Sequence, residues 1–116
     1  MINIPETTGV RKDGIINLKP KEADELIKQG GILVDIREGN EIMNMAFDVP
    51  DIMYCSFSSF GDDYINLPND KFLIISCAHG QRSQKAAMFL KSKGYNNIAN
   101  LLGGISEWNK YGLPVK

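Results

Sequence analysis

The chain has 116 residues, a length that favours one domain able to bury an ordinary core without disulfides or a structural metal. Its 13 basic and 14 acidic residues nearly cancel, which argues against nucleic acid or an anionic membrane as partner. No apolar run approaches membrane-spanning length, and the first residues lack the basic and apolar regions of a secretory signal. These features predict a soluble, cytoplasmic protein.

The first third of the chain predicts an arm followed by strand, helix and strand. Residues 1–14 show little hydrophobic periodicity and are expected to form an irregular N-terminal arm, ahead of one domain over residues 15–116. The segment 14–18 is consistent with a short edge strand. A helix is predicted over 20–29, with proline in its first turn and a glycine pair after its end. The segment 32–36, which is apolar except for Asp35 near its end, is predicted to be a buried strand.

The rest of the chain continues to alternate between the two kinds of element. Strands are predicted at 52–55, 72–76 and 97–102, helices at 39–45, 83–93 and 104–110, and helix or turn at 56–66. Apolar strands between helices favour an α/β fold, with a mainly parallel central sheet of about five strands and helices on both faces. Ligands of such folds bind beyond the carboxyl ends of the strands.

The segment Cys77–Ser83 lies at one such strand end and opens the strongest predicted helix. A loop of this kind directs backbone N–H groups and the positive end of a helix dipole at one sulfur atom, and Arg82 adds a charge. These features stabilise a thiolate and hold an anion, so Cys77 is the predicted nucleophile. The predicted substrate-binding residues are the other loop members, Ala78, His79, Gly80, Gln81, Arg82 and Ser83.

The spacing of the loop distinguishes two kinds of anion. From Cys77 to Arg82 the pattern is C-x4-R, one residue shorter than the C-x5-R cradle of tyrosine phosphatases. A shorter loop forms a smaller ring of N–H donors, which suits a single terminal sulfur better than a phosphoryl group. Sulfur chemistry is therefore favoured, and a phosphatase or arsenate reductase is the less favoured alternative.

Three blocks of the sequence resemble the single-domain rhodaneses, the thiosulfate-type sulfurtransferase family. The strand end 33–38, with Glu41 following, is similar to the family's D-x-R-E block. Residues 77–83 are similar to its C-x-x-G-x-R-S loop, and residues 102–115 to its closing block, with the pattern G-G-x-x-x-W…G-x-P-V. The segment 46–52 departs from the G-H-I-x-G-A pattern usual in the family. The resemblance covers residues 15–115.

This resemblance implies a ping-pong reaction through a persulfide on Cys77. The donor would be thiosulfate or a small persulfide, and the acceptor would be cyanide, a small thiol or a protein thiol. The backbone N–H groups of Ala78 to Ser83 would hold the anionic outer sulfur. The chemistry requires no cofactor and no metal. A rhodanese-fold binding or regulatory module without turnover is the principal alternative.

Several side chains near the loop are given supporting roles. Arg82 is expected to pair with Asp35 at the neighbouring strand end, with the donor anion as the alternative partner, and Asp35 and Arg37 are thus predicted to brace the loop. Ser83 is expected to cap the following helix. Cys55 is interpreted as a small apolar residue of a strand, with a resolving thiol as the alternative. Trp108 is expected to anchor the last helix in the core.

Overall fold

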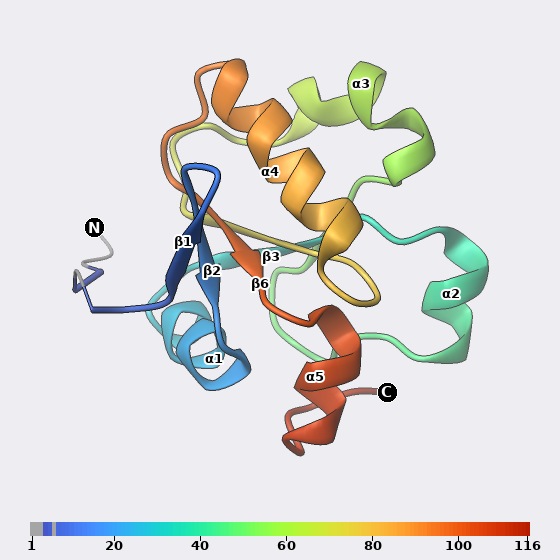
Figure 1. The fold of residues 1–116 in the computed structure, drawn as a ribbon. Helices are drawn as coiled ribbons and strands as arrows, with labels where there is room; N and C mark the ends of the chain where they lie inside the picture. The colour runs from blue at the N-terminus through green and yellow to red at the C-terminus, as the bar shows by residue number, and fades with distance from the viewer. Residues whose placement is uncertain (1–3, 6) are drawn as a thin grey trace.

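In the computed structural model, which describes residues 4–5 and 7–116, six strands form one sheet in the order β1-β2-β6-β5-β3-β4. All neighbouring pairs are parallel except β1 and β2 (Figure 1). The strands are β1 Val10–Lys12, β2 Ile15–Leu18, β3 Ile32–Asp35, β4 Met53–Tyr54, β5 Leu73–Ser76 and β6 Ile98–Leu101. The predicted α/β fold with a mainly parallel sheet is confirmed, with six strands in place of about five.

Strand β1 corrects the prediction of an irregular arm over 1–14. Val10–Lys12 pairs antiparallel with β2, so the strand predicted at 14–18 forms but has a neighbour on each side. The two strands are joined by a tight turn in which Asp13 and Gly14 both have positive φ, at 50° and 79°. All three β1 side chains are exposed, so no alternation marked the strand in the sequence. Residues 1–3 and 6 of the predicted arm lie outside the described residues.

Helices cover both faces of the sheet (Figure 1). They are α1 Pro20–Lys28, α2 Gly39–Asn44, α3 Phe60–Asp63, α4 Gln81–Ser92 and α5 Gly104–Lys110, with 3-10 turns at Phe57–Ser59 and Tyr64–Asn66. Successive strand residues point to opposite faces, so Ile75 packs in a core with α3 and α4 and Ile74 in a core with α1 and α5. No helix in the described part of the chain has the length and apolar character needed to cross a membrane.

The end of the chain completes the core that lies between the sheet and helices α1 and α5. Trp108 of α5 is fully buried, donates its indole N–H to the Pro114 carbonyl at 2.8 Å and contacts the Phe47 ring edge to face. Its predicted role as a core anchor is confirmed. Phe47, from the atypical segment 46–52, is also fully buried and forms an antiparallel bridge with Val115. This segment therefore contributes to the core beneath α5.

Candidate active site

Cys77 follows β5 directly, and helix α4 begins only four residues later, at Gln81. The sequence predicts that this helix begins at Ser83. The earlier start depends on Gly80, which precedes the helix with φ of 95°, a backbone conformation that glycine adopts at little cost. The predicted helix cap at Ser83 is wrong, because Ser83 lies inside the first turn. Its hydroxyl instead lies 3.3 Å from the Cys77 Sγ.

Three polar groups converge on the sulfur of Cys77. The N–H of Gly80 donates to Sγ at 3.1 Å, the N–H of Ser83 at 3.4 Å, and the Ser83 hydroxyl is positioned to donate to a thiolate. Burial by itself raises the pKa of Cys77, which is 1% exposed. Hydrogen bonds from Ser83, Gly80 and His79 outweigh burial, so the pKa of Cys77 is lowered overall. The local geometry thus favours the thiolate.

The guanidinium of Arg82 is held by Glu41 of α2. Its Nη2 lies 2.7 Å from Oε1 of Glu41 and its Nη1 lies 2.9 Å from Oε2, a bidentate arrangement. The expected pairing of Arg82 with Asp35 is wrong. Asp35 is instead paired with Arg37, at 2.8 Å, and both side chains are buried.

Asp35 and Arg37, which are predicted to brace the loop, are connected to it indirectly, through α2. Arg37 sits two residues beyond Asp35, so its guanidinium folds back onto the carboxylate at the end of the same strand. The Nη1 of Arg37 also donates to the backbone carbonyl of Glu41 at 3.3 Å. The buried pair therefore supports α2, and α2 presents Glu41 to Arg82. Glu41 belonged to the first sequence block but was given no role there.

Helix α5 packs directly against the loop backbone. The N–H groups of Ile105 and Ser106 donate to the carbonyls of Cys77 and Ala78, at 3.0 and 3.1 Å. This approach requires glycine at position 104, where a Cβ atom would lie 2.3 Å from the Cys77 carbonyl oxygen. This lack of space for a Cβ atom explains why the second residue of the Gly-Gly pair is glycine. It lets the start of α5 satisfy the carbonyls of the loop and fix its path.

Buried side-chain amides beneath the loop form a further support that the sequence analysis missed. Asn100 of β6 donates from Nδ2 to the Gly80 carbonyl at 3.0 Å and to Asn17 Oδ1 at 2.7 Å. Asn17 in turn donates to Gln84 of α4 at 3.0 Å. The signal available in the sequence was an asparagine in the middle of an apolar strand, which carries an unusual cost when buried.

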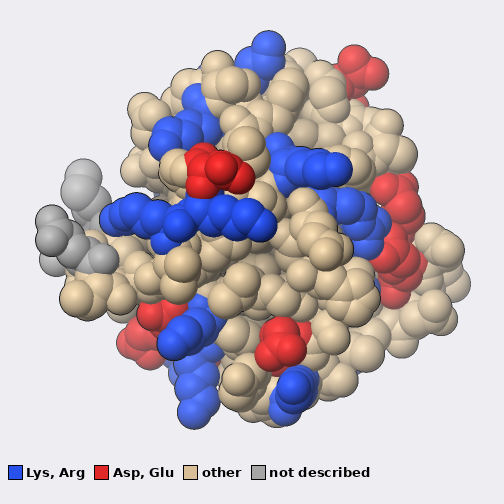
Figure 2. Space-filling model, in the orientation of Figure 1, with Lys and Arg blue, Asp and Glu red and all other residues tan. Residues whose placement is uncertain are grey.

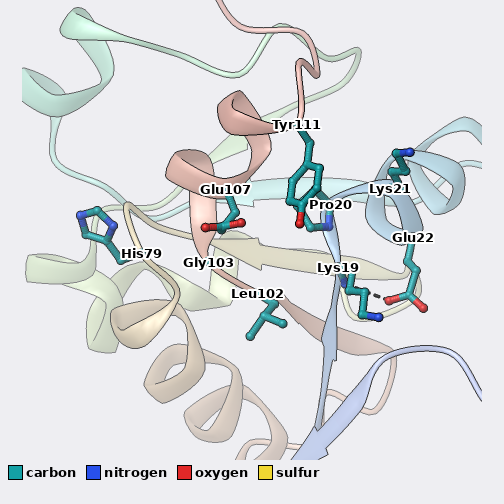
Figure 3. A pocket seen from close by; sticks show the side chains of 9 residues that line it. All are labelled: Lys19, Pro20, Lys21, Glu22, His79, Leu102, Gly103, Glu107 and Tyr111. Carbon is teal, nitrogen blue, oxygen red and sulfur yellow. Dashed lines mark hydrogen bonds between the residues drawn. The ribbon is translucent and has the colours of Figure 1, made fainter.

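Two clefts, each of about 570 Å³, meet at His79, Leu102 and Gly103 beside the loop. The first lies between the start of α1 and helix α5, with Tyr111 and Glu107 on one side and Lys19 on the other (Figure 3). The second lies between the β1–β2 hairpin and α4. The loop-tip residue His79 is exposed and lines both clefts.

The clefts combine apolar surface with charged side chains of both signs. Val10, Met88, Leu102 and Tyr111, which line one or both clefts, are 40% to 56% exposed. Figure 2 shows basic side chains on the same side of the molecule, over the β1–β2 hairpin and along α4, with acidic side chains over α2. No residue of the atypical segment 46–52 is among the described residues that line either cleft.

Comparisons with known proteins converge on one family. The rhodanese-like domain family matches residues 19–111. The thiosulfate sulfurtransferase GlpE of Haemophilus influenzae is 32% identical over 102 residues, which cover 84% of this chain and 91% of that protein. A sulfurtransferase of Allochromatium vinosum is 34% identical over 84 residues, covering 72% and 77%. The crystal structure of a rhodanese-related protein from Thermoplasma volcanium superposes with a TM-score of 0.78 at 30% identity, covering 86% and 96%.

Proposed function

The chain belongs to the rhodanese-like domain family and is a sulfurtransferase of that type, and from this premise we propose that it moves a sulfane sulfur through a persulfide on Cys77. The observation that carries the proposal is the convergence of the Gly80 N–H, the Ser83 N–H and the Ser83 hydroxyl on one sulfur. Such an arrangement stabilises a thiolate nucleophile without a general base.

In the first half-reaction the Cys77 thiolate attacks the outer sulfur of thiosulfate or of a small persulfide. A new S–S bond forms to Sγ while the S–S bond of the donor breaks. The leaving group, sulfite in the case of thiosulfate, departs with the bonding electron pair. Cys77 then carries a terminal sulfur with a negative charge, and no net oxidation or proton transfer is needed.

Main-chain dipoles are the proposed stabiliser of that terminal sulfur. Gly80 and Ser83 already donate to the inner sulfur, and the loop amides of Ala78, Gln81 and Arg82 lie next to them in the chain. The start of α4 adds the positive end of its helix dipole. Preorganised donors of this kind act on developing charge with little reorganisation, as in an oxyanion hole.

In the second half-reaction an acceptor thiolate or cyanide attacks the terminal sulfur, and Cys77 leaves as the thiolate. Each cleft beside His79 falls within the volume range typical of pockets that take organic ligands, and each is lined in part by exposed apolar side chains. These clefts suit an acceptor that carries its thiol on a larger body, such as a protein segment. We therefore include a protein thiol among the proposed acceptors, with thiosulfate or a persulfide as donor.

Intact-mass spectrometry after incubation with thiosulfate, and in parallel with a small persulfide, tests the proposal. One added sulfur atom is expected on the wild type and on Cys55→Ser, which removes the second cysteine of the chain. Cys77→Ser is expected to remain unmodified. Addition of cyanide to the loaded protein should remove the sulfur and release thiocyanate.

Two outcomes would redirect the assignment. Absence of an adduct from every donor, on a folded wild-type protein, would favour a binding module without turnover. Hydrolysis of an aryl phosphate that is lost in Cys77→Ser would favour phosphatase chemistry and refute the loop-size reasoning.

A further inference from the structure

We propose that Asn100 is a positioning residue of the active site, whose buried side-chain amide anchors the Gly80 carbonyl and thereby orients the loop N–H groups toward the reacting sulfur. This proposal deepens the function proposed above and rests on it for the role of the terminal sulfur. Neither Asn100 nor its buried partners belong to the sequence blocks on which the family resemblance was based.

Asn100 sits in β6 directly beneath the start of α4. Its side chain is 1% exposed, and its Nδ2 donates to the Gly80 carbonyl at 3.0 Å and to Asn17 Oδ1 at 2.7 Å. Asn17 donates to Gln84 Oε1 at 3.0 Å, and Gln84 donates to the Lys12 carbonyl at 2.9 Å. The amides thus connect the β1–β2 hairpin, β6 and α4 to one carbonyl of the loop.

Glycine at position 80 makes such an anchor necessary. Gly80 combines φ of 95° with freedom to adopt many other backbone conformations, so its geometry must be fixed from outside. Its N–H donates to Cys77 Sγ, while its carbonyl accepts from Asn100 and from the N–H of Gln84. One residue therefore connects the buried amides directly to the sulfur.

The geometry of the next peptide unit extends the effect. In a trans peptide the C=O and the following N–H point in opposite directions, and the described part of the chain has no cis peptide bond. Holding the Gly80 carbonyl against Asn100 consequently directs the Gln81 N–H away from β6. That orientation suits a donor to a second sulfur attached to Cys77.

The orientation of the Asn100 amide carries a cost. With Nδ2 facing the oxygens of Gly80 and Asn17, the Oδ1 of Asn100 is buried without a hydrogen-bond partner among the described residues. Unpaired buried oxygens destabilise a fold, and an aliphatic residue suits a parallel strand better. A requirement for a hydrogen-bond donor to the Gly80 carbonyl explains why position 100 carries an amide and not an aliphatic side chain.

The test measures the pH dependence of Cys77 alkylation by iodoacetamide, in a Cys55→Ser background. Asn100→Ala is expected to raise the pKa of Cys77 and to slow alkylation at pH 7 by about three- to tenfold, the effect of one weakened hydrogen bond. It should also shorten the lifetime of the thiosulfate-derived persulfide. Asn100→Leu, which fills the space without a donor, should behave in the same way if the alanine variant folds poorly.

Ile98→Ala is the matched control, because Ile98 is buried on the same strand and belongs to the core rather than to the loop contacts. It should lower stability and leave the alkylation profile unchanged. A folded Asn100→Leu or Asn100→Ala protein with the wild-type pKa for Cys77 would overturn the positioning role. Alkylation does not require sulfur transfer, so failure of the wild type to take up sulfur would refute the proposed function separately.

Discussion

Glu41→Gln removes the negative charge that faces Arg82 and keeps the size of the side chain. The hydrogen bonds from Arg82 lower the pKa of Glu41 from 4.5 to about 2, against the opposing effect of burial. Because one pKa unit corresponds to about 1.36 kcal/mol, full linkage to folding would give about 3.4 kcal/mol. The two side chains are 32% and 30% exposed, and solvent screening reduces the expected loss to about 1–2 kcal/mol.

The loss should depend on pH in a defined direction. The pKa of Glu41 is lower in the folded state, so its stabilising contribution is fully present above pH 4.5 and disappears as the pH falls toward about 2. Urea unfolding of the wild type and Glu41→Gln between pH 7 and pH 2 measures this contribution as a difference. That difference is expected to be largest at pH 7 and close to zero at pH 2.

Asp24→Asn provides the control, because it breaks an ion pair between Asp24 and Lys28 within helix α1. The Nζ of Lys28 lies 3.2 Å from Oδ2 of Asp24, and the lysine side chain is exposed. Pairs of this type contribute less than about 0.5 kcal/mol. A Glu41→Gln effect that stays constant with pH, or that does not exceed the Asp24→Asn effect, would refute the reasoning about the Arg82 pair.

Ser83→Ala removes the hydroxyl that lies 3.3 Å from Cys77 Sγ, so the pKa of Cys77 should rise. Iodoacetamide should then react with Cys77 about three- to tenfold more slowly at pH 7. An unchanged pH profile of alkylation would contradict this prediction. Gly104→Ala forces a Cβ atom against the Cys77 carbonyl, and urea unfolding should show that the free energy of unfolding falls by at least about 2 kcal/mol. As a control, Gly39→Ala places its Cβ atom in open space and should change the free energy of unfolding by less than about 1 kcal/mol. Burial raises the pKa of Cys55, so one equivalent of iodoacetamide at pH 7 should label Cys77 first, as read by peptide mass spectrometry; preferential labelling of Cys55 would argue against an activated Cys77.

The elements predicted correctly carry their signal in local sequence. Residues 72–75 are all apolar, and the strand β5, which contains three of them and Ser76, is buried on both faces. The helix α5 begins at the second glycine of a Gly-Gly pair and carries Trp108 toward the core. Because a strand and a helix bracket Cys77, the placement of this residue at the carboxyl edge of the sheet followed from the order of elements alone.

The features that were missed depend on contacts between distant parts of the chain. Arg82 and Glu41 are 41 positions apart, and the choice of Glu41 over Asp35 depends on the packing of α2 beside the loop. Strand β1 is held by backbone pairing, which leaves no hydrophobic pattern. In the same way, Asn100 looks like an interruption of an apolar strand until the fold places the Gly80 carbonyl above it.

The pairing of Arg82 has a consequence for how the site acts on anions. Glu41 already neutralises the guanidinium at 2.7 and 2.9 Å, so the hydrogen bonds that reach Cys77 come from main-chain amides and the Ser83 hydroxyl. The effect of such dipoles falls off quickly with distance, and they therefore favour an anion bound to Sγ more than they attract a dianion from solution. In the proposed reaction the charge moves from the inner to the outer sulfur by one bond length. A rigid loop, braced by Gly104 and Asn100, is suited to stabilise both positions without a change in conformation.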